Sequence, residues 1–304
     1  MKGLKNMVEI KNLHKSYKGF KVLKGLDMHI NKGDVYGFLG KNGCGKTTTM
    51  NIICDIIPKD EGEITLGEGE NEKIKIGYLP ETPALFDYMN GYEYLRYIAA
   101  CADYKGDIEK RIAECLNITG MTEGGKRRIK GYSRGMVQRL GIAATIFNNP
   151  DLIILDEPTS ALDPEGRAEV MRIIRNLTET GCTIILCTHI LSDVERVANR
   201  IGIMKNGSLA AEGSIREILD RYRTDSIELI PMKDDPDTLN LINKFPSAKS
   251  INYFDHSGKF VIETDNIEEG MSGLIKYLAE NNITVQSLNT SRPTLEQVYI
   301  DLVS

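Results

Sequence analysis

Residues 38–53 read FLGKNGCGKTTTMNII, a glycine-rich loop between two apolar runs, and this stretch decides the fold. Counted from Gly40, the loop has the spacing GxxxxGK(S/T) and ends on Lys46 and Thr47. A predicted strand, Val35 to Leu39, precedes it and a predicted helix follows, which is the setting typical of a phosphate-binding loop. The alternative is a glycine-rich turn with an incidental lysine, and the flanking strand and helix disfavour it.

The chemistry of phosphate binding accounts for these residue types. Glycine lets several backbone N–H groups approach anionic oxygens closely, and the start of the following helix adds a favourable partial charge. We therefore expect Lys46 to bridge the β- and γ-phosphates of a nucleotide and the Thr47 hydroxyl to bind Mg²⁺. The residues expected to contact the nucleotide here are Gly40, Lys41, Asn42, Gly43, Cys44, Gly45, Lys46, Thr47 and Thr48.

A second stretch, DLIILDEP at residues 151–158, ends a buried strand with two acids. This places Asp156 and Glu157 at the carboxyl edge of a sheet, where α/β folds bind their ligands. We expect Asp156 to hold Mg²⁺ through water and Glu157 to orient or deprotonate the attacking water. A strand capped by solvated carboxylates is the alternative, and the phosphate-binding loop makes it the weaker one.

The composition is that of an ordinary globular protein. The chain has 304 residues, enough for one large and one small domain, and its net charge of −5 argues against a nucleic-acid partner. No apolar run approaches the roughly 18 residues of a membrane span, and the N-terminus lacks the apolar core of a signal peptide. The six cysteines contain no CxxC pair and lie mostly in apolar segments, so free, buried thiols in a reducing cytoplasm are expected.

The patterns along the chain predict two domains, residues 1–222 and 223–304. The first begins with half-buried strands, turns helical over about 88–148, and then has two continuous apolar strands joined by a crossover helix. A hairpin turning at Asn206 and Gly207 closes it. The fold class expected is therefore α/β, with a β-rich N-terminal part and an inserted helical subdomain.

The second domain is predicted from a different pattern. Its first six elements follow the order βαββαβ, which predicts a small ferredoxin-like α+β domain, and one more helix, Leu295 to Val303, follows. The residues RTDS, 223–226, are the predicted linker. The sequence of this second domain contains no ligand motif. A packing or dimer-contact module is the simplest interpretation, and a ligand-sensing module is the alternative.

Between the two nucleotide motifs lies KGYSRGMVQRLGIAATIF, residues 130–147, and here the chain resembles a known family. It is similar to the nucleotide-binding subunits of ABC transporters, whose signature loop reads LSGGQ. The matching residues are YSRGM, which keep Ser133 and Gly135 but have Arg134 and Met136 in place of a glycine and the glutamine. This resembles the YSxGMxQR variant of a branch that exports drugs, antibiotics, lipids or ions. Without the family, Ser133 would be read only as a helix N-cap.

Other motifs of this family occur in the same order. SALD, residues 160–163, resembles the D-loop, and His189 matches the switch histidine beside the γ-phosphate. Tyr17 matches the aromatic that stacks on adenine, although strand aromatics are also common in cores. Glu81 stands where most relatives carry the Q-loop glutamine, and its carboxylate can still reach Mg²⁺ or water. The resemblance covers residues 8–213, and the C-terminal RPTLEQVYIDLV also resembles the tail of the export branch.

The resemblance implies a P-loop NTPase fold of ABC type that binds ATP and Mg²⁺. It implies Glu157 and His189 as catalytic residues, and Thr47, Asp156 and Glu81 as the metal site. It also implies a head-to-tail dimer of two copies, in which Ser133 and Gly135 of one meet the nucleotide of the other. A separate transmembrane permease and a place on the inner face of the cell membrane complete the expectation. The alternatives are a soluble ABC ATPase acting on ribosomes or nucleic acid, and a regulatory ATPase with a ligand-sensing C-terminal domain.

Overall fold

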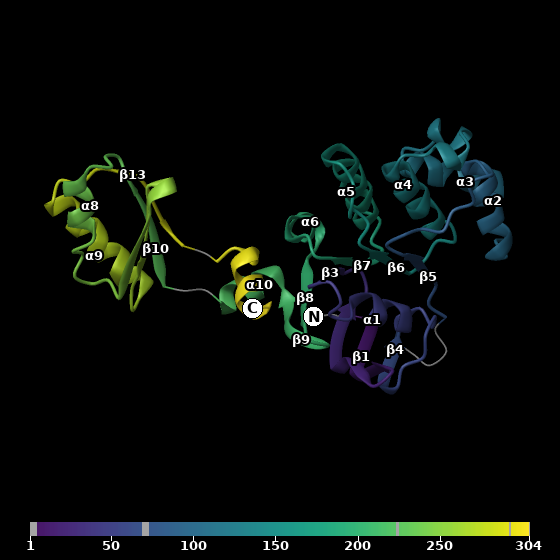
Figure 1. Ribbon diagram of the computed structural model, residues 1–304, viewed down its shortest axis with the longest axis horizontal. Helices are drawn as coiled ribbons and strands as arrows, with labels where there is room; N and C mark the ends of the chain where they lie inside the picture. Colours follow the sequence, from purple (N-terminus) through teal and green to yellow (C-terminus); the bar gives the residue numbers. More distant parts are fainter. Residues whose placement is uncertain (1–4, 69–72, 223–224, 292, 304) are drawn as a thin grey trace. The chain divides into compact units, whose positions relative to one another are not determined.

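The computed structural model describes residues 5–68, 73–222, 225–291 and 293–303. They form two compact units, Met1–Arg216 with Tyr299–Ser304, and Glu217–Val298 (Figure 1). The predicted boundary between residues 222 and 223, like the start of the predicted linker, falls at residues 223–224, outside the described residues. The end of the chain, which the sequence patterns assign to the second domain, joins the first unit, because buried Val303 contacts a loop there.

The first unit is built on a six-stranded sheet of order β5-β6-β7-β3-β8-β9. Its strands are β3 (Val35–Gly40), β5 (Ile76–Leu79), β6 (Leu152–Asp156), β7 (Thr183–Thr188), β8 (Arg200–Lys205) and β9 (Ser208–Ser214). All neighbours are parallel except the β8–β9 hairpin, whose turn at Asn206 and Gly207 has positive φ at both residues, as predicted. Every residue of β3, β6 and β7 is buried, as expected of parallel strands covered on both faces. Their carboxyl ends meet at one edge of the sheet.

A second, antiparallel sheet has the order β2-β1-β4. It consists of β1 (Asn6–Tyr17), β2 (Phe20–Asn31) and β4 (Glu61–Leu66), the β-rich part expected from the sequence. One hydrophobic core joins this sheet to the central one and to α1 (Lys46–Ile53), the helix after the glycine-rich loop. Leu26 of β2, Phe38 of β3 and Met50 of α1 all belong to this core and are fully buried. The glycine-rich loop is therefore held between the two sheets.

Helices surround the central sheet, and the predicted helical subdomain is present. It contains α2 (Gly91–Cys101), α3 (Ile108–Ile118), α4 (Arg134–Thr145) and the 3₁₀ turns η1 (Gly124–Lys126) and η2 (Ile129–Gly131). The crossover from β6 to β7 is α5 (Pro164–Thr178), and α6 (Leu191–Val197) and α7 (Ile215–Arg221) follow. Local sequence fixes several starts: Asn90 and Glu93 form a capping box on α2, and Asp163 caps α5 ahead of Pro164. None of the helices in the described residues combines the length and the apolar character needed to cross a membrane.

The second unit has the predicted ferredoxin-like topology. Its elements are β10 (Ser226–Pro231), α8 (Pro236–Ile242), β11 (Ser250–Phe254), η3 (Asp255–Ser257), β12 (Lys259–Glu263), α9 (Ile267–Glu280) and β13 (Val285–Thr290). The sheet order is β11-β12-β10-β13 with antiparallel neighbours, and the core centres on Leu229, Phe260 and Leu274. The last helix, α10 (Leu295–Val303), runs from this unit into the first.

Candidate nucleotide-binding site

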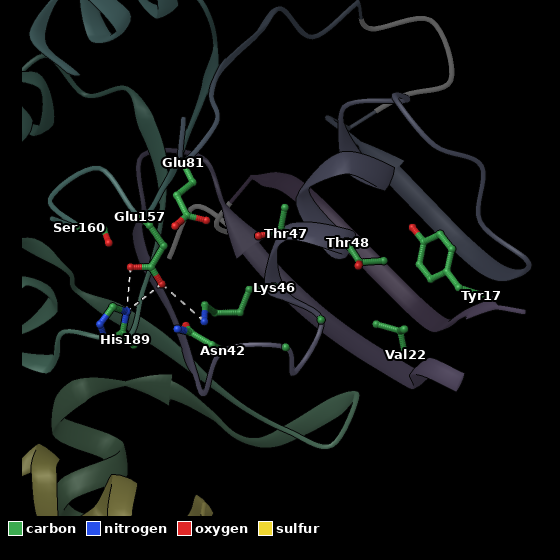
Figure 2. A pocket seen from close by; sticks show the side chains of 12 residues that line it. Tyr17, Val22, Asn42, Lys46, Thr47, Thr48, Glu81, Glu157, Ser160 and His189 are labelled. Atoms are coloured by element: carbon green, nitrogen blue, oxygen red, sulfur yellow. Dashed lines mark hydrogen bonds and ion pairs between the residues drawn. The ribbon is translucent and has the colours of Figure 1, made fainter. Parts of the chain in front are cut away.

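A cavity of about 480 Å³ lies beside the loop that follows β3. It is lined by Tyr17, Val22, Asn42, Gly43, Gly45, Lys46, Thr47, Thr48, Glu81, Glu157, Ser160 and His189 (Figure 2). Nearly all of these are site residues predicted from the sequence. Val22 and Ser160 are additional: Ser160 belongs to the predicted D-loop, whereas Val22 gave no signal, since an apolar strand residue has the same pattern in a core and at a cavity wall.

The glycine-rich loop, residues 40–47, has a backbone that its sequence permits. Gly43 and Gly45 have φ of +80° and +113°, which only glycine adopts readily, and Gly45 is the N-cap of α1. Lys46, at the start of that helix, is 6% exposed and its Nζ donates to the carbonyls of Gly40 at 2.7 Å and Lys41 at 3.4 Å. The loop thus places a helix N-terminus and a buried ammonium together at the cavity wall, an arrangement suited to phosphate.

Asp156 ends β6 directly beneath the loop and is fully buried. Thr47 Oγ1 donates to its Oδ2 at 2.7 Å, while Oδ1 has no hydrogen-bond partner among the described residues. Burial raises the pKa of Asp156, and the Thr47 hydrogen bond opposes this only in part. A hydroxyl beside an unpartnered carboxylate oxygen is a donor set that fits Mg²⁺. The described residues contain no group of three or more His, Cys, Asp or Glu placed to hold a metal.

Glu157 lies between a cation and a histidine. Its carboxylate is 3.6 Å from Lys46 Nζ and 3.0 Å from His189 Nδ1, and Figure 2 shows all three side chains pointing toward one another. Its backbone N–H donates to the Cys187 carbonyl of β7 at 2.8 Å, and its φ is +48°, an unusual value for a residue with a side chain. Strained backbone of this kind is concentrated at functional sites. This conformation places the Glu157 carboxylate at the cavity, where it can accept a proton from a water molecule.

The opposite end of the cavity is aromatic. Tyr17 and Val22 lie there, away from Glu157 and His189 (Figure 2). Tyr17 is 45% exposed, so it is not a core aromatic, and Lys15 Nζ lies 5.5 Å from the centre of its ring. An exposed ring at one end and phosphate-binding groups at the other match the two ends of a nucleotide.

Comparison with known proteins identifies the family. The ABC transporter family profile matches residues 23–160, and the profile "ATP-binding protein DrrA1-3-like, C-terminal domain" matches residues 213–303. The chain is 31% identical to the linearmycin resistance ATP-binding protein LnrL of Bacillus subtilis (strain 168), over 97% of this chain and 98% of that protein. It belongs to the ATP-binding subunits of ABC transporters. It is also 31% identical to the bacitracin transport ATP-binding protein BcrA of Enterococcus faecalis, over 98% of this chain and 96% of that protein.

Solved structures agree with this assignment. A dimeric ATP-binding cassette in a post-hydrolysis state, bound to ADP and Pi, is similar to this ATP-binding subunit with a TM-score of 0.61. The two sequences are 28% identical, and the match covers 69% of this chain and 99% of the other. This ABC ATP-binding subunit is therefore an ATPase. The alternative of an ATPase acting on ribosomes or nucleic acid is not favoured, because the matched relatives are transporter subunits.

The signature residues of the ATP-binding subunit lie outside the nucleotide cavity. Ser133 caps α4, accepting a hydrogen bond from the Met136 N–H at 3.3 Å, as a helix N-cap does. Together with Arg134 and Gly135 it lines a second hollow of about 510 Å³. The structure therefore brings together the loop, the two acids, Glu81, His189 and Tyr17, but it does not bring Ser133 and Gly135 to them.

Glu81 connects the two regions through its main chain. Its backbone carbonyl accepts a hydrogen bond from Gln138 Nε2 of α4 at 3.1 Å, and its side chain lines the nucleotide cavity. Contact between Glu81 and a metal stays a prediction. The main-chain contact gives the segment after β5 a direct link to the helix that carries the signature.

The six cysteines are all free. Cys115 and Cys187 are buried, Cys101 is exposed, and the other three are partly covered. Burial raises the pKa of Cys115 to about 11 and that of Cys54 to about 12, so both remain neutral thiols at neutral pH.

Proposed function

We propose that two copies of this chain form the ATP-driven motor of an exporter for antibiotic-like molecules, acting on a separate membrane permease at its cytoplasmic face. The observation that carries the proposal is that one chain holds the phosphate-binding loop and the signature residues in two separate hollows. A nucleotide can touch both kinds of residue only when a second chain supplies the missing half. The export direction and the cargo class rest on similarity to the linearmycin resistance and bacitracin transport subunits.

The dimer converts ATP binding into movement. In the proposed head-to-tail pair, Lys46 of one chain and Ser133 and Gly135 of the other contact the same γ-phosphate. ATP then binds the closed pair more tightly than the open one, and only such a difference in affinity can drive a conformational change. Loss of the γ-phosphate removes the bridge, and the pair opens.

The geometry supports a role for each residue around the phosphates. Thr47 Oγ1 and Asp156 Oδ1 would hold Mg²⁺, which when bound neutralises charge on the phosphate oxygens. Glu157 orients the attacking water and accepts its proton, and His189 positions the Glu157 carboxylate through its 3.0 Å contact. Tyr17 stacks on the adenine ring. We propose that Glu81 contacts the metal or its water from the remaining side.

A cluster of exposed aromatics after Glu81 is the proposed permease contact. Phe86 packs against Tyr97 and Tyr88 with ring centroids 5.2 Å and 5.7 Å apart, and Tyr88 is 68% exposed. The cluster borders a groove of about 420 Å³ between β5, α2 and α4, lined in part by Tyr94. Aromatic side chains are enriched at protein interfaces. Because Gln138 links this segment to α4, contact here can respond to the nucleotide state.

The test is co-expression with the membrane protein encoded by a neighbouring gene. The pair should co-purify from membranes and raise the tolerance of a sensitive host to a membrane-active peptide or polyene antibiotic, and Lys46→Ala should abolish the tolerance. Tyr88→Ser with Tyr97→Ser should release the subunit from membranes while its ATP binding persists. Phe254→Ser, an exposed aromatic of the second unit, is the matched control and should leave the complex intact. A complex that survives loss of the aromatic cluster would refute the proposed permease contact. A host that gains no tolerance would refute the proposed export function.

A further inference from the structure

The last turn of α10 contacts the phosphate-binding loop. Residues 299–303 cluster with the ATPase unit, although α10 follows the second unit in the sequence (Figure 1). Lys41 Nζ, from the second residue of the loop, donates a hydrogen bond to the backbone carbonyl of Val303 at 3.2 Å. The Val303 side chain is buried. The last described turn of α10 is thus anchored on the loop that binds phosphate.

Tyr299 supports the same placement. It lies four residues before Val303, so the two share one face of α10. Its side chain is partly buried, and its pKa is raised first by burial and then by the nearby Cys44 thiol and Glu157 carboxylate. One face of the helix therefore carries both the carbonyl that is bonded to Lys41 and the partly buried Tyr299 side chain.

The partners of this contact are chemically matched. The last carbonyls of a helix accept no hydrogen bond from within the helix, and they form the negative end of its dipole. A lysine ammonium is therefore a favourable partner for them. The main chain of Lys41 faces the other way: its carbonyl accepts a hydrogen bond from Lys46 Nζ at 3.4 Å. Lys41 consequently contacts both regions: its side chain bonds the C-terminal turn of α10, and its carbonyl bonds Lys46.

The loop has reason to need such an anchor. With glycine at positions 40, 43 and 45 it has much conformational freedom to lose when it closes around phosphate. A group that fixes the loop beforehand reduces this entropic cost and so tightens binding. Lys41 is absent from the described residues that line the nucleotide cavity, which suits an anchor rather than a ligand.

We infer that Lys41 and the last turn of α10, Tyr299–Val303, form a positioning contact that holds the phosphate-binding loop ready for ATP. The end of the chain then sets ATP affinity, although it contributes no ligand to the nucleotide. The inference concerns ATP binding by this subunit alone, so it can fail or hold independently of export and of the permease.

The experiment is a double-mutant cycle read by titration with a fluorescent ATP analogue and by steady-state hydrolysis. Lys41→Met in the full chain should raise the Kd and KM for ATP about two- to fivefold, the size of one charge contact at a helix end. The kcat should change little, since the catalytic carboxylate is untouched. Lys41→Arg, which keeps a charged donor, should restore the affinity. Ending the chain at Val298 should weaken ATP binding as Lys41→Met does, whereas ending it at Val303 should not.

The combined variant decides the matter. With residues 299–304 removed, Lys41→Met should have no further effect, because its partner is already gone. Effects that multiply would show that Lys41 touches the nucleotide itself and would overturn the inference, as would single variants with unchanged Kd. Thermal melting without nucleotide monitors folding. If the shortened chain does not fold, the comparison of Lys41→Met with Lys41→Arg still decides whether the donor matters.

Discussion

Asp156 and Glu157 are neighbours in sequence with opposite surroundings. Asp156 is fully buried, and burial raises its pKa. Glu157 instead has two nitrogen partners, Lys46 Nζ at 3.6 Å and His189 Nδ1 at 3.0 Å. We therefore expect the two adjacent carboxylates to have different tasks, because their partners differ.

Replacing Asp156 by Asn should stabilise the fold while weakening the metal-dependent binding of ATP. Because its folded-state pKa is raised above the ordinary 3.8, the ionised carboxylate costs stability, and this cost grows as pH rises from about 3.8 through the folded-state pKa. Asp156→Asn should therefore melt about 2–4 °C above the parent chain at pH 8, the shift that 1 kcal/mol produces in a domain of this size. The difference should shrink as pH falls toward 4.

The matched control is Asp151→Asn, just before the same strand, where the carboxylate accepts a hydrogen bond from the Lys75 N–H. It should bring no gain in melting temperature at pH 8. Melting curves at several pH values, with and without Mg²⁺ and ATP, make the comparison. If the gain in melting temperature of Asp156→Asn stayed constant with pH, burial of a charged carboxylate could not be its cause.

At the scale of elements, the phosphate-binding loop and α1 act as one unit whose shape depends on Gly45. This residue has φ of +113°, and a Cβ added there would lie 2.8 Å from Leu23 and 2.9 Å from Met204. Gly45→Ala should abolish ATP binding in a titration, since it displaces the start of α1 and Lys46 with it. Strain of this kind also costs about 1–3 kcal/mol of stability.

Gly181→Ala separates the loss of ATP binding from the loss of stability. Gly181 has φ of +78° with open space around a new Cβ, and it lies before β7, outside the described residues that line the cavity. It should lower the melting temperature through backbone strain but keep ATP binding. If it lost nucleotide as Gly45→Ala does, general destabilisation and not loop geometry would explain both.

The elements that position the site could be predicted because each has its own pattern. The continuous apolar runs of β3, β6 and β7 predict buried parallel strands, and parallel strands bring the loop, the acids and His189 to one edge. The contact of Lys41 with Val303 could not be predicted, because it joins residues 262 apart through a backbone carbonyl that has no sequence signature. The position of the last turn of α10 depends on packing between residues far apart in the sequence, and local sequence patterns do not encode such packing.

At the scale of the whole molecule, each chain carries two separate hollows, which we propose to be the two halves of a shared site. The nucleotide cavity contains Lys46 and Glu157, while the signature hollow contains Ser133, Arg134 and Gly135. Arg134 is exposed in this hollow, and its Nη1 lies 3.4 Å from the Ala161 carbonyl of the D-loop. In the proposed head-to-tail pair we expect this guanidinium to add positive charge on the side of the partner's γ-phosphate.

Two defective chains should therefore repair each other. In a Glu157→Gln background, which slows hydrolysis and should keep the ATP-bound pair closed, Lys46→Ala removes nucleotide binding. Ser133→Asp instead keeps binding but places a negative charge against the partner's phosphate. Neither variant should dimerise alone with ATP, as followed by size-exclusion chromatography with light scattering.

Mixing the two should restore a fraction of the dimer, because the intact Ser133 of one chain then meets the intact Lys46 of the other at one of the two sites. The control is a chain that carries both changes, mixed with the background chain, since a dimer of these two chains has no site with both halves intact. Because the background chain also pairs with itself, one chain of each mixture carries an affinity tag, and only dimers that contain both kinds of chain are counted. Mixed dimers in the first mixture and none in the second are the result that head-to-tail pairing requires. Mixed dimers in the second mixture and none in the first would mean that each chain completes its own site, in conflict with the separation of the two hollows within one chain.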